Sequence, residues 1–253
     1  MNLKYNIFKT VFAYLFILQS TTNGLILTRS LLDQWYGTRL TSLKYLDLMN
    51  KEITAIEPNT FSGLINLCEL FLKDNQISSI DFRTFNGLTG LYELDLSSNK
   101  ISWIDQRTFN GLVNLKYILI SDNNLSSIHP STFNGLVSLE YLALQINRIS
   151  SVDPKLFEGL KSLGTLSLHH NQIDTIDPNT FNGLSNLESL YLNNNQIKTI
   201  DPKTFTGLTS LENLYLYSNQ ISSIDSDVFK SLTRLKRLEL YSNQFTSIET
   251  SVF

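Results

Sequence analysis

Two glutamates are the first candidates for catalysis in this chain. Glu69 and Glu93 are 24 residues apart, and the sequence repeats with that period, so they hold the same position in consecutive repeats. If each repeat adds one strand to a parallel sheet, their backbones lie about 4.8 Å apart, and paired carboxylates are the groups that retaining glycosidases use. An open sheet provides no water-excluding pocket, and we expect Lys44 and Lys73 to neutralise the pair. The sequence therefore predicts no enzymatic activity.

Histidine and cysteine give no stronger candidate for a metal or a nucleophile. His169 and His170 are adjacent, so on a strand their side chains diverge, whereas a zinc site needs three or four converging ligands. His129 belongs to another part of another repeat. Cys68 is the one cysteine, and without a histidine to activate it we expect a free thiol. We predict neither a metal nor a cofactor.

A column of aspartates suggests calcium at first sight, but it fits helix capping better. Asp201 precedes Pro202, and this pair is typical of a helix N-cap followed by the first helical residue. Gly207 lies where a positive φ would end such a turn. The same aspartate recurs in six repeats, as Asp81, Asp105, Asp153, Asp177, Asp201 and Asp225.

The elements that position these residues are repeats of 24 residues, and a fixed period of that length indicates a solenoid. Each repeat opens with L-x-x-L-x-L, whose alternating leucines predict one short strand, and parallel neighbours require a crossover that is right-handed in nearly all proteins. The nine repeats begin at Leu43, Leu67, Leu91, Leu115, Leu139, Leu163, Leu187, Leu211 and Leu235, and the last is incomplete.

Two further columns predict what lies inside the solenoid. Asparagine stands at the ninth position of eight repeats, from Asn75 to Asn243, and we expect its buried amide to bond backbone groups at the turn. Lys51 replaces it in the first repeat, as suits a terminal unit. Phenylalanine recurs every 24 residues from Phe61 to Phe253 and should form a stacked core.

These columns of Leu, Asn, Ile, Phe and Gly-Leu resemble the leucine-rich repeat proteins of the typical 24-residue extracellular subclass. Toll-like receptor ectodomains, Slit proteins, small leucine-rich proteoglycans and variable lymphocyte receptors share this pattern. The resemblance covers residues 43–253. It implies an α/β repeat solenoid, a right-handed horseshoe with a concave parallel β-sheet and short helical or irregular turns on the convex side. It does not choose a ligand, which the variable positions set.

The exposed columns of the strands carry the candidate binding residues. We expect the second, third, fifth, seventh and eighth positions of each repeat to be exposed. Aromatic residues gather toward the C-terminal end, beside Glu212 and Glu239 as a polar rim, and apolar residues gather in the middle. Tyrosine is enriched at protein interfaces, although tyrosines also pack well between strands and duplication copies them. The C-terminal group is Tyr191, Tyr215, Tyr217 and Tyr241; the middle group is Tyr117, Leu119, Tyr141, Ala143 and Ile146.

The chain termini predict export and a partly formed cap. Residues 1–24 combine two lysines, an eight-residue apolar run and small polar residues, which is typical of a secretory signal peptide and too short for a membrane span. Residues 25–42 read as a degenerate capping segment in which Trp35 and Tyr36 cover the first core layer. The repeats stop at Phe253 within a unit, so we expect a further segment to follow in the full protein.

Charge and sequon positions complete the prediction of function. The net charge is −3 and the 20 basic residues are scattered, so we expect no nucleic-acid partner. Asn124 begins the one N-glycosylation sequon, which is as consistent with chance as with use. We predict a non-catalytic, secreted or cell-surface recognition module that binds a protein ligand on its concave face. A matrix component of the small leucine-rich proteoglycan type and a protein inhibitor of an enzyme remain alternatives, and the oligomeric state is left open.

Overall fold

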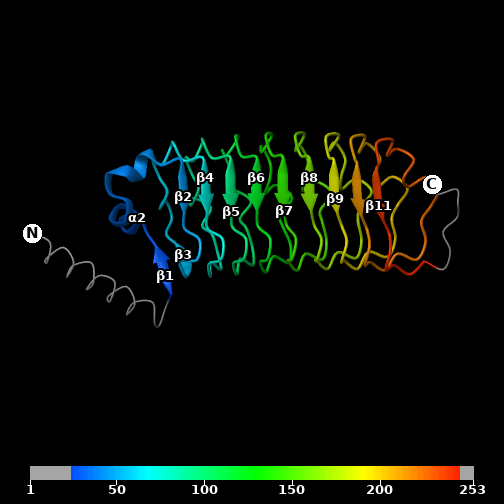
Figure 1. Cartoon of the computed structure of the whole chain (residues 1–253), viewed down its shortest axis with the longest axis horizontal. Coiled ribbons are helices and arrows are strands. Elements are labelled where there is room, and N and C mark those ends of the chain that lie inside the picture. The colour runs from blue at the N-terminus through cyan, green and yellow to red at the C-terminus, as the bar shows by residue number, and fades with distance from the viewer. Residues whose placement is uncertain (1–23, 246–253) are drawn as a thin grey trace, which may run out of the picture.

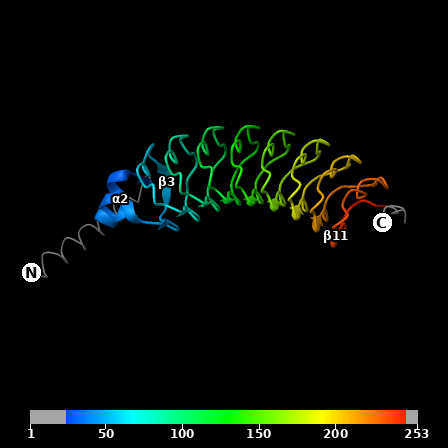
Figure 2. The same cartoon turned by 90° about the horizontal axis from the view of Figure 1, so that it is seen from above.

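The computed structural model describes residues 24–245 of the 253-residue chain. Over this part the chain winds into a curved solenoid, and its main sheet has nine parallel strands in the order β11-β10-β9-β8-β7-β6-β5-β4-β2. The strands stand side by side along the long axis (Figure 1) and line the inner side of the arc (Figure 2). The predicted right-handed horseshoe with a concave parallel sheet is confirmed. The predicted signal peptide lies outside the described residues, except for Gly24.

Each strand of the main sheet is three residues long and holds the same place in its repeat. Paired strands are in register, so Leu94 lies beside Leu70 on one side and Ile118 on the other. The middle residue of each strand points into the core, as the alternation of leucines predicts. The strands are β2 (Tyr45–Asp47), β4 (Glu69–Phe71), β5 (Glu93–Asp95), β6 (Tyr117–Leu119), β7 (Tyr141–Ala143), β8 (Thr165–Ser167), β9 (Ser189–Tyr191), β10 (Asn213–Tyr215) and β11 (Arg237–Glu239).

The segment before the first repeat forms a strand and two short helices. Strand β1 (Leu25–Leu27) pairs in parallel with β3 (Ile53–Ile56) as a separate two-stranded sheet. Helix α2 (Arg29–Tyr36) begins after Thr28, whose hydroxyl accepts a hydrogen bond from the Leu31 N–H at 3.1 Å. The 3-10 helix η1 (Gly37–Ser42) buries Leu40 in the core. Trp35 and Tyr36 are partly buried against that core, where the sequence placed them.

The predicted asparagine ladder is present and joins each repeat to the one before it. In Asn147, Nδ2 donates to the carbonyls of Ile120 at 3.0 Å and Leu144 at 3.1 Å. Oδ1 accepts from the Leu125 N–H at 3.0 Å. The ladder asparagines from Asn75 to Asn219 are buried, while Lys51 in the first repeat is exposed.

The phenylalanine column is likewise a stacked core. Phe85 and Phe109 have ring centroids 6.5 Å apart and planes within 8° of parallel. Phe229 is only partly buried, and Phe253 lies outside the described residues. The fully buried members are Phe61, Phe85, Phe109, Phe133, Phe157, Phe181 and Phe205.

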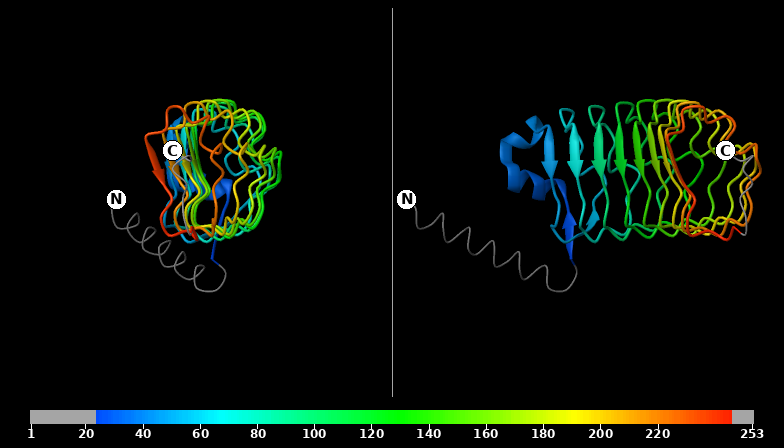
Figure 3. Two further views of the ribbon diagram at one scale, coloured as in Figure 1. Left: turned by 90° about the vertical axis from the view of Figure 1, so that its right-hand side faces the viewer. Right: turned by 45° about the vertical axis from the view of Figure 1, so that its right-hand side comes forward.

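The convex side of residues 43–245 consists of turns that do not develop into helices, which is the irregular form of the predicted convex turns. Single i to i+3 bonds follow one another, as from Thr84 N–H to the Asp81 carbonyl at 2.9 Å and from Leu88 N–H to the Phe85 carbonyl at 3.2 Å. Gly87 at φ +83° lies within this series and leaves the helical region of φ and ψ, so the successive bonds do not join into a helix. Viewed close to the solenoid axis, the coils have similar outlines (Figure 3, left).

Candidate recognition surface

The concave face is the surface of the main sheet, formed by the third and fifth positions of each repeat. Most of these side chains are half-buried because neighbouring strands crowd them. The prediction that all such positions are exposed is wrong for Asp95, Ala143 and Ser167, which are buried. Ala143 has no exposed surface at all, so it leaves the apolar middle group. Short side chains on a concave sheet are covered by longer ones on strands about 4.8 Å away.

The C-terminal tyrosines form two face-to-face pairs. Tyr191 on β9 and Tyr215 on β10 have ring centroids 4.5 Å apart and planes within 5° of parallel. Tyr217 and Tyr241, just beyond β10 and β11, repeat this geometry at 4.5 Å and 8°. Burial is the main cause that raises the pKa of Tyr191 and that of Tyr217, so the hydroxyls remain neutral. The sequence indicated the cluster but not this pairing.

The polar rim beside the tyrosine pairs is balanced in charge. Glu212 accepts from the Lys236 ammonium at 2.7 Å, and Glu239 lies 3.8 Å from Arg237. Interaction with the Tyr215 hydroxyl raises the pKa of Arg237. The C-terminal part of the concave face is therefore a neutral aromatic surface with charged groups that are already paired.

The middle group divides into a strand part and an edge part. On the strands, Tyr117 lies beside Tyr141, and Leu119 beside the buried Ala143. The Tyr117 hydroxyl donates to Glu140 Oε2 at 3.4 Å. Ile146 follows β7 in the left-handed region at φ +56°, and 49% of it is exposed. The structure thus separates Ile146 from the other members of its predicted group.

One member of the carboxylate pair is bonded by a tyrosine rather than by a lysine. Glu69 and Glu93 are neighbours on β4 and β5 as predicted. The Tyr92 hydroxyl donates to Glu69 Oε1, which raises the pKa of Tyr92 to about 12. Burial, followed by the charges of Glu69 and Asp95, raises the pKa of Glu93. Within residues 24–245 neither Lys44 nor Lys73 forms an ion pair with these glutamates, so the predicted neutralisation by lysine is wrong.

The histidines and the cysteine do not converge on a common site. The ring centroids of His169 and His170 lie 5.5 Å apart in an edge-to-face contact, and His169 also lies 5.8 Å from the ring of Tyr191. Cys68 is a half-buried free thiol. No group of three or more His, Cys, Asp or Glu side chains in the described part of the chain is arranged to hold a metal ion.

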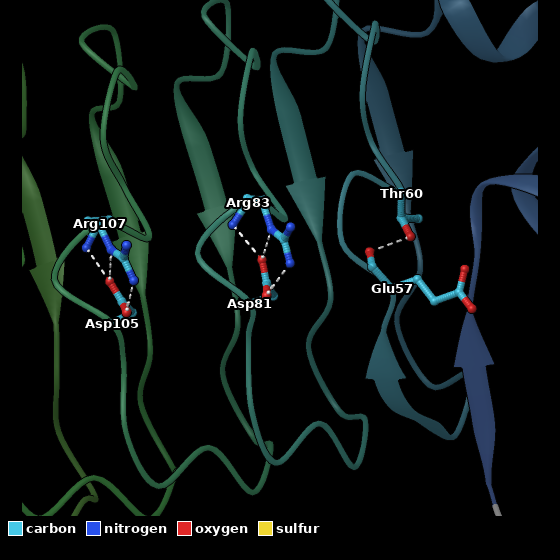
Figure 4. Close-up of polar contacts among 6 residues, drawn as sticks. All are labelled: Glu57, Thr60, Asp81, Arg83, Asp105 and Arg107. Atoms are coloured by element: carbon cyan, nitrogen blue, oxygen red, sulfur yellow. Dashed lines mark hydrogen bonds and ion pairs between the residues drawn. The ribbon is translucent and has the colours of Figure 1, made fainter.

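The aspartate column caps the convex turns, as predicted. Asp81 Oδ1 accepts from the Arg83 N–H at 2.9 Å, and Asp105 Oδ1 from the Arg107 N–H at 2.9 Å. Each arginine side chain also folds back onto its aspartate through two hydrogen bonds (Figure 4). These bonds lower the pKa of Asp105 to about 2 and that of Asp81 in the same direction. The oxygens of these carboxylates therefore already accept hydrogen bonds from the turn backbone and from arginine, which explains the column without calcium.

Sequence reasoning missed a row of buried polar atoms at the seventh position of three consecutive repeats. Gln145 Oε1, His169 Nδ1 and Asn193 Oδ1 are buried and have no hydrogen-bond partner among residues 24–245. The signal in the sequence was a series of amide, imidazole and amide side chains in a column that holds serine hydroxyls, Ser97 and Ser121, in the two preceding repeats. The sequon residue Asn124 is half-buried, and its N–H donates to the Ile101 carbonyl at 2.9 Å. Its glycosylation remains a prediction.

Comparisons with known proteins agree with this architecture. A family model described as leucine rich repeat matches residues 41–101, 89–149, 139–197, 165–221 and 209–253. A crystal structure of a TLR13–ssRNA13 complex is similar to this chain, with a TM-score of 0.80 and 31% identity over 87% of this chain. The functional domain of InlJ from Listeria monocytogenes has a TM-score of 0.66 and 25% identity over 84% of this chain. A search of curated proteins found no match.

This chain corresponds to only part of each similar structure. It spans 31% of the TLR13 chain and 43% of the InlJ chain. Between residues 24 and 245 the helices are too short or too polar to cross a bilayer.

Proposed function

This chain belongs to the leucine-rich repeat family, and we propose that within that family it is a non-catalytic extracellular recognition module whose concave face binds a protein ligand. The observation that carries the proposal is the pair of tyrosine stacks, Tyr191 with Tyr215 on the sheet and Tyr217 with Tyr241 just beyond it, in a region whose charged groups are paired. Tyrosine offers large contact area at low entropic cost, and clustered aromatic residues commonly dominate binding energy.

Charge favours a protein over a nucleic acid as the ligand. The arginine and lysine nearest the tyrosine stacks, Arg237 and Lys236, are paired with Glu239 and Glu212, so few cations are free to meet phosphates. Toward the N-terminal end the concave face carries Glu69 and Glu93. The similar TLR13 structure is a complex with a single-stranded RNA, and RNA therefore belongs in the binding test.

The test compares one double variant with a matched control on the same face. Tyr215→Ser with Tyr217→Ser removes one ring from each stack, whereas Tyr45→Ser removes an exposed tyrosine at the other end of the sheet. The probes are a panel of purified extracellular domains and secreted hydrolases, with one single-stranded RNA, measured by surface plasmon resonance. We expect the double variant to bind its protein ligand at least tenfold more weakly, about 1.4 kcal/mol, with an unchanged circular dichroism spectrum.

Several results would contradict the proposal. Full affinity in the folded double variant would show that the tyrosines only pack between strands. Tyrosine-dependent binding of the RNA alone would replace the protein ligand with a nucleic acid. Many weak, non-saturating contacts would favour the matrix alternative, and selective capture of a hydrolase with loss of its activity would favour an inhibitor.

The extracellular location rests on residues 1–24, which have the composition of a signal peptide. Expression of the full chain in a secretory cell line should yield exported protein whose first residue lies between Thr21 and Leu25, as N-terminal sequencing would reveal. Cytosolic protein that retains Met1 would contradict the proposal.

A further inference from the structure

The eighth position of every repeat has a left-handed backbone, and one repeat fills it with an unsuitable residue. The φ angles at this position lie between +53° and +56°. Asparagine, aspartate, serine and histidine occupy it elsewhere, and short polar side chains tolerate this region. Ile146 is the exception, and a β-branched residue at positive φ is strained. The other residues are Asn50, Asp74, Ser98, Asp122, His170, Asn194, Ser218 and Ser242.

The strain at Ile146 cannot relax locally, and burial does not offset it. The Ile146 N–H donates to the His169 carbonyl at 3.1 Å, and its carbonyl accepts from the Asn123 N–H at 3.2 Å, so the neighbouring repeats fix the backbone. The side chain is 49% exposed, and half of its apolar surface gains nothing from the core. In the chain without a ligand, Ile146 therefore destabilises the fold through its strained backbone and leaves half of its apolar side chain in water.

A second unfavourable feature lies beside Ile146. The buried atoms Gln145 Oε1, His169 Nδ1 and Asn193 Oδ1 lack partners, and Asn193 is only 3% exposed. In the two preceding repeats the residues of this column bond to each other, because the Ser121 hydroxyl donates to that of Ser97 at 3.0 Å. Buried polar groups without partners are rare and each one costs stability. The unsatisfied stretch of this column is confined to repeats five to seven, next to Ile146.

We propose that Gln145, Ile146, His169 and Asn193, here named the edge strip, form a second contact for the protein ligand, at the end of the strands beyond the concave face. The occupant is an uncharged extended segment of that ligand: an apolar side chain covers Ile146, and N–H groups donate to Gln145 Oε1 and Asn193 Oδ1. The inference rests on the proposed function and extends the contact from Tyr217, which has the same seventh position in the repeat after that of Asn193, toward the N-terminal repeats.

The chemistry of the edge strip selects this kind of occupant. Both amide oxygens accept hydrogen bonds, so the phosphate oxygens of a nucleic acid, which also only accept, do not match them. A sugar would bring donors but little apolar cover for Ile146. Because the acceptors lie under neighbouring side chains, the ligand must turn the half-buried Gln145 outward. The strip contains no carboxylate, ammonium or guanidinium group, which disfavours a charged segment.

The test is Ile146→Asn, which places at this position the residue that Asn50 and Asn194 provide in other repeats. We expect a higher urea midpoint, because the strain is relieved, together with at least tenfold weaker binding to the panel ligand recognised by the wild-type chain. Gln145→Ser, which copies Ser97 and Ser121, should also weaken binding without lowering the urea midpoint. Ser98→Asn is the control in the same column and should change neither quantity.

The outcomes separate this inference from the proposed function. A lower urea midpoint for Ile146→Asn, or unchanged affinity for both edge-strip variants, would overturn the edge strip. If the tyrosine double variant still binds weakly in the second case, the proposed function stands alone. Loss of affinity in the edge-strip variants with none in the tyrosine variant would keep the edge strip and reject the tyrosine surface.

Discussion

At the scale of single residues, the threonines that recur on the convex side show that the same side chain at the same position of a repeat can make different hydrogen bonds. The Thr60 hydroxyl donates to the Glu57 carbonyl at 2.7 Å (Figure 4) and has the Leu27 carbonyl at 3.3 Å. In five later repeats the buried hydroxyl has no partner, and in two others Leu156 and Val228 take its place. The later hydroxyls are Thr84, Thr108, Thr132, Thr180 and Thr204.

We therefore predict opposite effects for the same substitution at two places in this column. Thr108→Val should leave the free energy of unfolding unchanged or raise it, because a buried hydroxyl without a partner is replaced by a methyl group. Thr60→Val should lower it by about 1 kcal/mol, the usual net value of one hydrogen bond. Urea unfolding of both variants measures the difference. An equal loss in both would mean that Thr108 has a partner.

The pairs of aspartate and arginine on the convex side should make the free energy of unfolding depend on pH in the acid range. Hydrogen bonds from Arg107 lower the pKa of Asp105 to about 2, against about 3.9 in an unfolded chain. A depressed pKa means that the stabilising contribution is complete above about pH 4 and disappears as the pH falls toward 2. Asp105→Asn cannot titrate, so its melting temperature should lie below that of the wild type at pH 5 and approach it near pH 2.

Thermal unfolding at several pH values measures this convergence. The exposed residue Ser127 supplies a control, since Ser127→Ala should differ from the wild type by a constant amount. A gap between wild type and Asp105→Asn that widens toward pH 2 would show that the sign of the pKa shift is wrong.

At the scale of the element, each repeat is stabilised mainly by its interactions with the repeats on either side. The three-residue strands are too short to be stable alone, and the asparagine ladder satisfies backbone groups at both sides of every junction. One asparagine therefore supports two repeats, as Asn147 does through Leu125 and Leu144.

Removal of one asparagine should be costly in the middle of the ladder. Asn147→Ala leaves a buried N–H and buried carbonyls without partners, and each such group costs about 1–3 kcal/mol. We expect the free energy of unfolding in urea to fall by at least about 2 kcal/mol. Ser189→Ala, which loses the acceptor of the Asn213 side chain at 3.1 Å, should cost much less. Equal midpoints would contradict the assignment of inward and outward positions.

At the scale of the whole molecule, the solenoid should be unevenly stable, because repeats interact with their neighbours only. Leu46 in β2 and Leu48 just after it are buried, and η1 precedes the strand. The corresponding Leu238 in β11 and Leu240 just after it are only partly buried. Within the described residues β2 and β11 are both edge strands of the main sheet, so the difference between them lies in how well their leucines are covered.

Amide hydrogen exchange followed by mass spectrometry should therefore rank the strands. We expect exchange in β11 to be faster than in β2, and exchange in the central β7 to be the slowest, because opening free energies follow local burial. The same rate in all three strands would mean that the solenoid opens only as a single cooperative unit.

The sequence alone determined the architecture and much of its interior. The 24-residue period sets which residues become neighbours on the backbone, so the strands, the asparagine ladder, the phenylalanine core and the aspartate caps could all be read from recurring types. Gly207, placed by the pattern in a turn, has φ +93°. Each of these features recurs at an interval of 24 residues, and the sequence shows which residues have that separation.

The tertiary structure alone decided how the side chains of the recognition surface meet. Whether Tyr191 packs face to face on Tyr215, whether Tyr92 reaches Glu69, and whether Ala143 is covered depend on rotamers and on side-chain size across several strands. The strain at Ile146 likewise appears only once its backbone angle is known. A repeating sequence specifies its framework many times over, whereas each contact on the variable face occurs once and is set by its neighbours in space.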